Sequence, residues 1–336
     1  MDIFKNKTIL ITGGTGSFGR NFAKHLLQNA SLKKLIIFSR DEFKQMQLSD
    51  EIGGDKRVRF FIGDVRDRSR LARAFEGVDI IVHAAALKQV PTLEFNPFEA
   101  IKTNVNGSQN VIEEAINNNV DKVLLISTDK AAQPANLYGA TKLCAEKLFV
   151  SGNVYSAGRT KFSVVRYGNV MGSRGSVIEK ILKKDNLETI HITHESMTRF
   201  WINLEQSFEL VLFALKNMNG GEIFVPKISS MKLTDLFDVL APNAKRKIIG
   251  IRPGEKMHEV LLTKEESRHA LELEKYFAVL PEHEEFFNSK KRYANLLKTG
   301  KKVRDDFEFT SDTNKDWLTK EKFQKIVSII KTQISK

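Results

Sequence analysis

The chain has little of several features that mark other classes of protein. It contains one cysteine, Cys144, which excludes an internal disulfide and any metal site built from clustered cysteines. No apolar run approaches the ~20 residues that a membrane-spanning helix needs. The first five residues lack the apolar core of a signal peptide and lead directly into an apolar strand. We therefore expect a cytoplasmic protein with no bound metal and no membrane contact.

The net charge is basic, but the basic residues are dispersed. Lysine and arginine number 53 against 41 aspartates and glutamates, a formal charge of +12. Such an excess suits nucleic acid, but it also suits anionic small molecules such as nucleotide phosphates. Because the lysines are not interleaved with aromatic residues in a stacking pattern, we predict no nucleic-acid partner. The length of 336 residues fits two joined globular domains.

Strands and helices are predicted to alternate from residue 8 to about residue 167. Short apolar runs predict strands at 8–12, 35–38, 58–62, 80–82, 123–126 and 162–165, and helical spacing predicts a long helix over 97–119. This alternation is typical of an α/β fold with a doubly wound parallel sheet. Beyond residue 167 the elements are shorter and mixed, with helices predicted at 204–217 and 319–334.

A glycine-rich turn follows the first predicted strand. Gly13, Gly16 and Gly19 lie between that strand and a helix, which is the context in which such glycines let a backbone approach a pyrophosphate. Asp64 and Val65 end the third strand, where adenine is usually contacted, and small residues at 84–86 leave room beside the fourth. His83 is expected to be a packed or capping histidine. We predict a dinucleotide-binding (Rossmann) domain over residues 1–167.

The end of the second predicted strand bears on the choice between NAD and NADP. An acidic residue ~20 positions past the glycines would bind the ribose 2′-hydroxyl of NAD. Ser39 stands there instead, and Arg40 suits the 2′-phosphate of NADP. We predict NADP, with the alternative that Arg40 is merely solvated and that Asp41 or Glu42 binds the ribose.

The segment after the fifth predicted strand carries four ionisable residues. Tyr138 and Lys142 are four apart, so on a helix they share a face, where a lysine charge favours a phenolate that can act as a base. Asp129 and Lys130 add an acid and an amine to the same end of the sheet. The alternative is that the Tyr-x-x-x-Lys spacing arose by chance. The convergence of these residues with the glycine loop favours a catalytic role.

Three arginines lie on glycine-rich or polar stretches of the second half of the chain. Arg174, Arg199 and Arg252 could bind a diphosphate through paired hydrogen bonds. Each could equally form a surface ion pair. We predict that the three bind an anion together.

The glycine triplet with Tyr138-x-x-x-Lys142 resembles the motif pairing of the extended short-chain dehydrogenase/reductase superfamily. Within it, the chain is similar to the inverting UDP-N-acetylglucosamine 4,6-dehydratases of pseudaminic acid biosynthesis. The shared motifs lie at 127–131, 136–142, 165–170 and 252–256, and the similarity covers nearly the whole chain. Larger, membrane-anchored retaining dehydratases share the Thr-Asp-Lys run but usually carry methionine at the position of Tyr138.

The resemblance implies a reaction and a set of roles. Tyr138, helped by Lys142, takes the proton of the sugar's 4-hydroxyl while the C4 hydride passes to NADP⁺. Lys130 removes the C5 proton, protonated Asp129 donates to the departing 6-hydroxyl, and the hydride returns to C6. Reprotonation of C5 from the opposite face, with Tyr138 as the expected donor, inverts that centre. Lys130 acts as a base only if its pKa is lowered, which we expect from burial and from cationic surroundings that include Lys142.

The resemblance also implies binding residues and an organisation. The expected cofactor-binding residues are Gly13, Gly16, Ser17, Phe18, Gly19, Ser39, Arg40, Asp41, Lys44, Asp64, Val65, Ala84, Ala85, Ala86, Asn104, Tyr138 and Lys142. The expected substrate-binding residues are Lys88, Thr128, Asn169, Arg174, Arg199, Arg252 and Glu255. Residues 168–336 are expected to form mainly a smaller mixed α/β substrate domain, with 192–218 returning to the Rossmann domain. A homo-oligomer, a hexamer, is implied.

Two other functions compete with this interpretation. A UDP-N-acetylhexosamine 4-epimerase on the same fold needs the tyrosine and lysine but not Asp129 and Lys130. A catalytically idle NADP-binding regulator often lacks the tyrosine or the lysine, and both are present here. Turnover of a nucleotide sugar and the identity of its product would separate the three.

Overall fold

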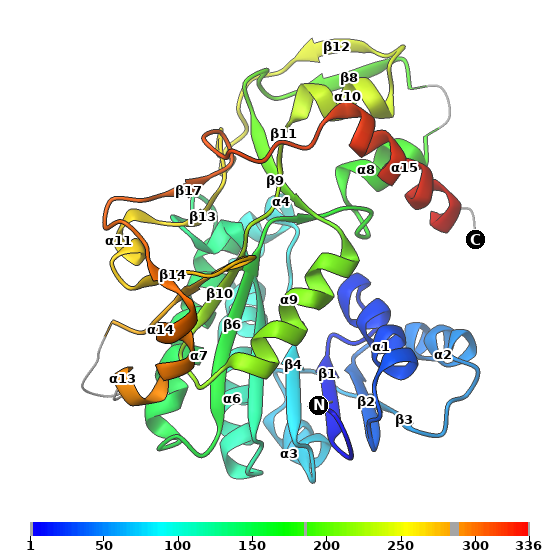
Figure 1. The fold of residues 1–336 in the computed structure, drawn as a ribbon. Helices are drawn as coiled ribbons and strands as arrows, with labels where there is room; N and C mark the ends of the chain where they lie inside the picture. Colours follow the sequence, from blue (N-terminus) through cyan, green and yellow to red (C-terminus); the bar gives the residue numbers. More distant parts are fainter. Residues whose placement is uncertain (1–2, 185–186, 283–288, 335–336) are drawn as a thin grey trace.

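A large central sheet dominates the computed structural model, which describes residues 3–184, 187–282 and 289–334 (Figure 1). In this part of the chain ten strands form one sheet in the order β16-β14-β15-β10-β6-β5-β4-β1-β2-β3. All neighbours from β10 to β3 pair in parallel, whereas β14, β15 and β16 pair antiparallel at one edge. The parallel strands are β1 (Thr8–Thr12), β2 (Lys34–Ser39), β3 (Val58–Ile62), β4 (Ile80–His83), β5 (Lys122–Thr128), β6 (Lys161–Tyr167) and β10 (Ile223–Pro226). The antiparallel strands are β14 (Ala270–Glu272), β15 (Tyr276–Val279) and β16 (Lys301–Lys302).

The predicted doubly wound parallel sheet is confirmed, and each predicted strand lies within an observed one. The central apolar runs are strands because the sheet buries them on both faces; all five residues of β1 are buried, whereas β3 at the edge buries only Phe61. The order of the sheet reverses between β1 and β4, because the chain moves outward to β2 and β3 before it returns to β4. Ligands of such sheets bind beyond the carboxyl ends of the strands at this reversal.

Helices cover both faces of the sheet. The helix α9 (Leu204–Asn217) crosses in front of it in Figure 1 and contacts α1 (Ser17–Asn29), β5 and β6. Behind it, α3 (Arg68–Phe75), α6 (Gly107–Asn117) and α7 (Leu137–Tyr155) pack in series. The helix α2 (Glu42–Glu51) packs on β2. None of the described helices is both long and apolar enough to cross a membrane.

The helix predicted over 97–119 is interrupted. It begins as α5 (Pro97–Ala100), continues as a π-helical turn η1 (Ile101–Asn106) and ends as α6. Within the π turn, the Asn104 amide donates to the Leu87 carbonyl and to Thr141 Oγ1, and its oxygen accepts from the Leu87 N–H. Wider π turns often occur where a helix supports a site. Apolar spacing alone does not distinguish the π turn from α-helix.

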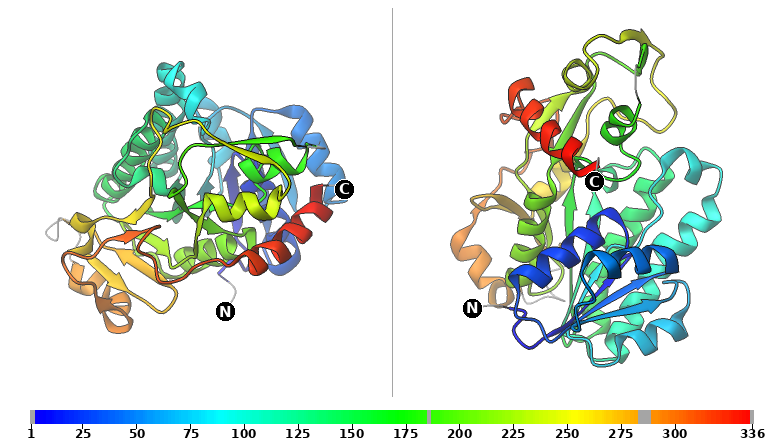
Figure 2. Two further views of the ribbon diagram at one scale, coloured as in Figure 1. Left: turned by 90° about the horizontal axis from the view of Figure 1, so that it is seen from above. Right: turned by 90° about the vertical axis from the view of Figure 1, so that its right-hand side faces the viewer.

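A second group of elements, here called the small lobe, lies above the carboxyl ends of the parallel strands (Figure 2). It contains a sheet of β7 (Asn169–Val170), β9 (Thr198–Ile202) and β11 (Ser230–Lys232), and a parallel pair of β8 (Thr189–Ile192) and β12 (Lys245–Ile248). Its helices are α8 (Val177–Leu182), α10 (Leu233–Leu240) and α15 (Lys320–Ile334). These elements share an apolar core of their own, which includes Met171, Ile178, Trp201, Met231 and Phe323.

Several shorter elements complete the described part of the chain. They are α4 (Val90–Glu94), η2 (Asp129–Ala131), β13 (Val260–Leu262), α11 (Lys264–Ser267), α13 (Ser289–Arg292), α14 (Ala294–Thr299) and β17 (Phe309–Thr310). The helices predicted at 204–217 and 319–334 are present as α9 and α15. The main sheet takes β10, β14, β15 and β16 from beyond residue 167. The assignment of the two domains along the chain stays a prediction.

Candidate active site

A cavity of about 790 Å³ opens where the parallel strands end. Its walls come from the turn after β1, the ends of β2 to β5, the start of α7 and the loop between β6 and α8. Most residues predicted for catalysis, the cofactor or the substrate line it, namely Gly13, Gly16, Ser17, Phe18, Gly19, Ser39, Arg40, Asp41, Lys44, Asp64, Val65, Ala84, Ala85, Ala86, Lys88, Thr128, Lys130, Tyr138, Lys142, Asn169 and Arg174. Five do not contribute to its lining: Asn104, Asp129, Arg199, Arg252 and Glu255.

The glycine turn is built for a close approach of backbone atoms. Gly13 has φ +65°, and a Cβ added to it would lie 2.8 Å from the Ala85 backbone. A Cβ at Gly19 would lie 2.6 Å from the Gly13 carbonyl oxygen. Gly16 precedes α1 and supplies no capping side chain, so the first N–H groups of the helix have no side-chain partner from that position. This arrangement fits a pyrophosphate group.

The end of β2 presents Arg40 beside two acids. The Arg40 side chain is half exposed, and its Nη1 atom lies 3.4 Å from Asp64 Oδ2. Asp41 is already engaged, because it caps α2 by accepting from the Lys44 N–H at 3.0 Å and pairs with the Lys44 ammonium. A ribose hydroxyl would therefore compete with the helix cap for the Asp41 carboxylate. The Arg40 guanidinium caps none of the described helices, and its contact with Asp64 is long, at 3.4 Å.

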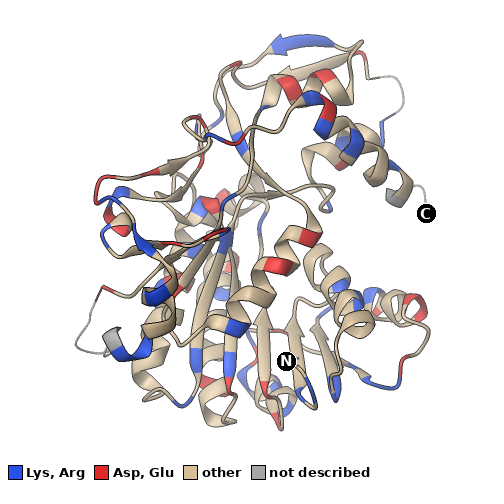
Figure 3. Cartoon of the chain, in the orientation of Figure 1, with Lys and Arg blue, Asp and Glu red and all other residues tan. Residues whose placement is uncertain are grey.

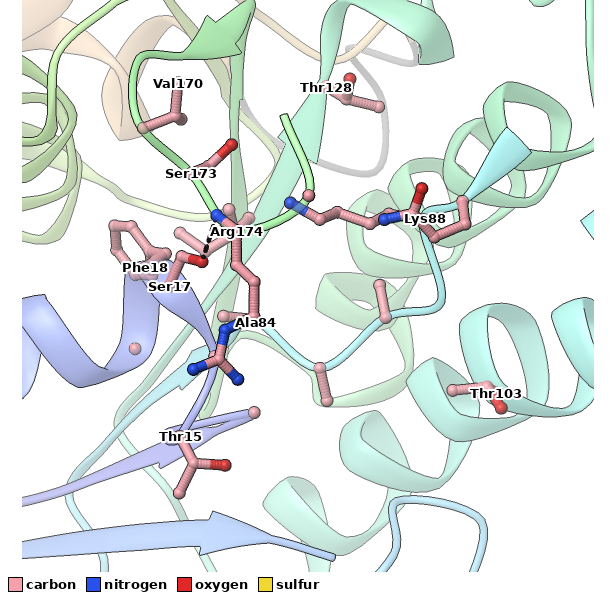
Figure 4. Close-up of a pocket in the computed structure, with 18 of the residues that line it drawn as sticks. Thr15, Ser17, Phe18, Ala84, Lys88, Thr103, Thr128, Val170, Ser173 and Arg174 are labelled. Atoms are coloured by element: carbon pink, nitrogen blue, oxygen red, sulfur yellow. Dashed lines mark hydrogen bonds between the residues drawn. The ribbon is translucent and has the colours of Figure 1, made fainter. Parts of the chain in front are cut away.

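Arg174 reaches the cavity from the small-lobe side. Its N–H donates to Ser17 Oγ at 2.9 Å, which joins the loop after β7 to the first turn of α1. Figure 4 shows the guanidinium group beside Ala84 and above Thr15 of the glycine turn, with Lys88 pointing into the same space. Arg174 therefore lies over the glycine turn, where a cofactor's phosphates are expected.

Tyr138 and Lys142 lie one turn apart at the start of α7, as predicted. The Lys142 amine is buried and donates to the Ile126 carbonyl at 2.8 Å, and burial lowers its pKa to about 8. Burial raises the pKa of Tyr138 to about 12, against the opposing effects of the Lys130 charge and a hydrogen bond with Thr128. The expectation of a lowered pKa for the phenol is wrong here, because desolvation and the Asp129 charge outweigh the Lys130 charge and the hydrogen bond with Thr128.

Lys130 lies between two carboxylates. Its Nζ atom is 3.1 Å from Asp129 Oδ1 and 3.2 Å from Glu259 Oε1. Burial acts to lower the pKa of Lys130, but the charges of Asp129 and Glu259 outweigh it and raise that pKa above its ordinary value. The expectation of a lowered Lys130 pKa is therefore also wrong. The Asp129 carboxyl is 1% exposed and burial raises its pKa.

Glu259 was not predicted from the sequence. It lies directly before β13 and three residues past the shared motif at 252–256, which does not include it. Tyr167 and Trp201 also line the cavity without having been predicted. Tyr167 lies in the shared motif at 165–170, so the family resemblance could have identified it. Glu259 could be found only once the fold had brought it to Lys130.

The remaining predicted residues lie outside the cavity wall. Arg199 is buried, donates to the carbonyls of Thr198 at 2.7 Å and Met257 at 3.1 Å, and lies 3.5 Å from Glu259. Arg252 is exposed and has Glu255 4.0 Å away. Their loop is held to α7 because Asn136 Nδ2 donates to the Gly254 carbonyl at 2.9 Å. In this structure the three predicted arginines do not line one cavity together.

His83 is packed, as expected. It is 1% exposed, its Nδ1 atom lies 2.7 Å from Thr12 Oγ1, and its Nε2 atom lies 3.3 Å from Ser108 Oγ. Burial lowers its pKa to about 3, so it is neutral at physiological pH. Figure 3 shows lysine and arginine spread over both parts of the molecule, in keeping with their dispersal along the sequence.

Comparison with known proteins identifies the family. A family model described as polysaccharide biosynthesis protein matches residues 9–281. The chain belongs to this family. A UDP-N-acetylglucosamine 4,6-dehydratase (inverting) from Campylobacter jejuni is 48% identical over 331 residues, which cover 97% of this chain and 98% of that protein. The resemblance predicted from the motifs is confirmed.

Other proteins to which the chain is similar carry different names. A UDP-glucose 4-epimerase from Rickettsia rickettsii is 44% identical over 286 residues, covering 82% of this chain and 84% of the relative. The solved structure of Pen from Bacillus thuringiensis matches with a TM-score of 0.86 and 39% identity, over 97% of this chain and 98% of that one. The structure of DesIV, a dTDP-glucose 4,6-dehydratase from Streptomyces venezuelae, matches over 74% of this chain and 86% of that one. It is 22% identical with a TM-score of 0.68, and shows that the fold is shared.

Proposed function

We propose that the protein is a UDP-N-acetylglucosamine 4,6-dehydratase that inverts C5. The observation that carries this proposal is the Asp129–Lys130 pair, which adjoins Tyr138 and Lys142 at the same end of the sheet as the glycine turn. A hydride transfer alone requires neither the acid nor the amine. Loss of water across C5 and C6 requires both a base and an acid.

The cavity fits a nicotinamide dinucleotide, and we propose NADP. The N–H groups at the start of α1 would hold its pyrophosphate, and Arg40 would contact its 2′-phosphate. When bound, the cofactor would accept the hydride of sugar C4 and later return it to C6. Arg174 lies above the same loop (Figure 4) and would face the cofactor's phosphates. A nicotinamide ring carrying positive charge would also counter the high pKa that burial imposes on Tyr138.

The side chains of the chain divide the proton transfers between them. Tyr138 would take the proton from the 4-hydroxyl, and Lys142 would orient the sugar and cofactor from the next turn of α7. Oxidation at C4 acidifies the C5 proton, which the Lys130 amine would remove. The protonated Asp129 carboxyl would donate to the 6-hydroxyl as water leaves. Reprotonation of C5 from the opposite face inverts that centre.

The product would be UDP-2-acetamido-2,6-dideoxy-β-L-arabino-hex-4-ulose, the first intermediate on the way to pseudaminic acid. Lys88, Thr128 and Asn169 line the cavity beside the proposed catalytic groups and are proposed substrate contacts. We extend the proposal to a cytoplasmic homo-oligomer with its nucleotide-sugar site mainly in residues 168–336.

Because the Rickettsia relative is named an epimerase, the product must be identified directly. Wild-type protein with UDP-N-acetylglucosamine and no added cofactor should give the 6-deoxy-4-keto sugar, identified by NMR. Formation of the C4 epimer alone would favour the epimerase.

Replacing Arg40 by aspartate should weaken the binding of NADP⁺ far more than that of NAD⁺. The new carboxylate would repel a 2′-phosphate and accept a hydrogen bond from a 2′-hydroxyl, and each good charge-assisted contact contributes about 1.5–3 kcal/mol. We expect NADP⁺ binding to weaken by about tenfold or more and NAD⁺ binding to weaken little. Fluorescence or calorimetric titration of the purified protein with each cofactor measures this. Equal weakening of both would show that Arg40 does not contact the phosphate.

A further inference from the structure

Glu259 is a buried carboxylate that the proposed reaction does not yet use. Its side chain is 3% exposed, and its Oε1 atom lies 3.2 Å from Lys130 Nζ and 3.5 Å from Arg199 Nε. Lys256 Nζ lies 3.8 Å from the second oxygen, Oε2, which accepts no hydrogen bond from the described residues. A carboxylate this deep in the protein is costly to bury without partners, so its position calls for an explanation.

The backbone holds Glu259 in place from several sides. Its N–H donates to Ser311 Oγ at 2.9 Å, and its carbonyl accepts from the Ser311 N–H at 2.9 Å. Lys256, three residues earlier, donates to the Ala132 carbonyl at 2.6 Å, just after η2. The segment that carries Glu259 is therefore fixed to the segment that carries Asp129 and Lys130.

The two carboxylates beside Lys130, Asp129 and Glu259, differ in their affinity for a proton. Burial alone would raise the pKa of Glu259, but Lys130, Arg199 and Lys256 together hold that pKa below its ordinary value. Asp129 is different, because burial raises its pKa and the charge of Glu259 adds to that rise. Its Oδ2 atom is buried and accepts no hydrogen bond from the described residues. Within this cluster, Asp129 is the carboxylate suited to accept a proton.

We propose that Glu259 is a positioning residue for Lys130. It holds the Lys130 amine against Asp129, so that Lys130 passes a proton to Asp129 before the C5 proton of the sugar is removed. In that exchange an N–H bond of Lys130 breaks and an O–H bond of Asp129 forms across the 3.1 Å contact. Both groups lose their charge and the total charge of the cluster is unchanged. The products are a neutral amine and a carboxylic acid, the two forms that elimination needs. Glu259 keeps its hydrogen bond to Nζ, and Arg199 and Lys256 offset its charge.

This inference rests on the proposed function, and it predicts a shift in pH dependence. The titratable groups that face the Lys130 amine are Asp129, Tyr138, Arg199, Lys256 and Glu259. The pair is active when it holds one proton in total, carried by Asp129 with the amine neutral, so exchange at C5 should increase as pH rises and the doubly protonated pair loses its first proton. The negative charge of Glu259 raises the pKa of that first step by stabilising the doubly protonated pair. Glu259→Gln keeps the shape of the side chain and a hydrogen-bond acceptor but removes the charge. The ascending limb of the plot of C5 exchange rate against pH should therefore move to lower pH by about one to three pH units.

The experiment follows deuterium entry at C5 of UDP-N-acetylglucosamine against pH in wild type, Glu259→Gln and Glu265→Gln. Glu265 is exposed on α11 and controls for the loss of one negative charge elsewhere. We expect a shifted limb, a lower plateau rate and an unchanged KM in Glu259→Gln, because Glu259 does not line the cavity. An ascending limb at the same pH in Glu259→Gln and wild type would overturn the inference. If Glu259→Gln fails to fold, Glu259→Asp, which retracts the charge by one methylene, should move the limb in the same direction.

A second measurement separates this inference from the proposed function. Competitive labelling of Lys130 with an amine reagent, in full-length protein without substrate, reports the proton affinity of the amine whatever reaction the protein catalyses. Labelling of Glu259→Gln should reach half-maximum at lower pH than labelling of wild type. If wild type makes no keto sugar, the proposed function fails. If the two labelling curves coincide, the role of Glu259 fails even where the keto sugar is made.

Discussion

Lys130→Ala is expected to stop the reaction between oxidation at C4 and loss of water. The variant keeps Tyr138, Lys142 and the glycine turn, so the 4-hydroxyl can still be oxidised. It lacks the amine that removes the C5 proton, and losing a positioned proton-transfer group costs ~10²–10⁴ in rate. Absorbance of reduced nicotinamide should therefore appear on adding UDP-N-acetylglucosamine and persist, while the 6-deoxy-4-keto sugar forms that much more slowly than in wild type.

Tyr138→Phe is the matched control for this variant. It removes the group that takes the 4-hydroxyl proton and leaves the Asp129–Lys130 pair in place. No reduced nicotinamide should appear, because oxidation itself is blocked. If Lys130→Ala makes the keto sugar at the wild-type rate, the assignment of Lys130 as the C5 base is wrong, whatever Tyr138→Phe does.

Arg166→Leu is expected to destabilise the fold by about 3–5 kcal/mol, because it breaks a buried ion pair and leaves carboxylates without a partner. The Arg166 side chain is 0% exposed, and its Nη2 atom lies 2.6 Å from Glu146 and 2.7 Å from Glu266. Glu146 is on α7 and Glu266 on α11, so Arg166 links β6 to the catalytic helix and to the segment after β13. Urea unfolding followed by circular dichroism measures the loss.

Arg304→Leu provides the comparison for Arg166→Leu. Arg304 pairs with Asp306 at the surface, where both side chains are more than two-thirds exposed, at 79% and 73%. Exposed pairs contribute at most about 1 kcal/mol, so this variant should unfold close to wild type. Equal unfolding midpoints for the two variants would show that the Arg166 pairs do not stabilise the fold.

The main sheet and the glycine turn could be predicted from the sequence because each has a local cause. A parallel strand buried on both faces must be a short apolar run, and a Cβ at Gly13 would lie only 2.8 Å from the Ala85 backbone, so only glycine fits there. Tyr138 and Lys142 could be paired because helical spacing brings residues four apart to one face. These predictions needed no knowledge of which distant segments meet.

The charge balance of the site could not be predicted, because it depends on distant segments. Lys130 was expected among cations, yet pairing of β13 with β17 and the packing of the loop before it bring Glu259 to its amine. The phenol of Tyr138 was expected to be acidic, yet the depth of its burial could not be read from the motif. Arg252 was grouped with Arg174 by chemistry alone, and only Arg174 lines the cavity.

The central claim, elimination with inversion at C5, is tested most directly by the position of hydrogen isotopes in the product. Wild-type protein is incubated in deuterated water with ¹³C-labelled UDP-N-acetylglucosamine that carries ordinary protium at C4. The carbons that carry protium and deuterium in the product are then identified by NMR. The account predicts deuterium at C5 in the inverted configuration, because a base removes that proton and solvent-derived deuterium returns from the other face, and it predicts the original C4 hydrogen at C6. Protium retained at C5, an uninverted C5 in the ring couplings of the product, or deuterium from water at C6 in place of the C4 hydrogen would contradict it.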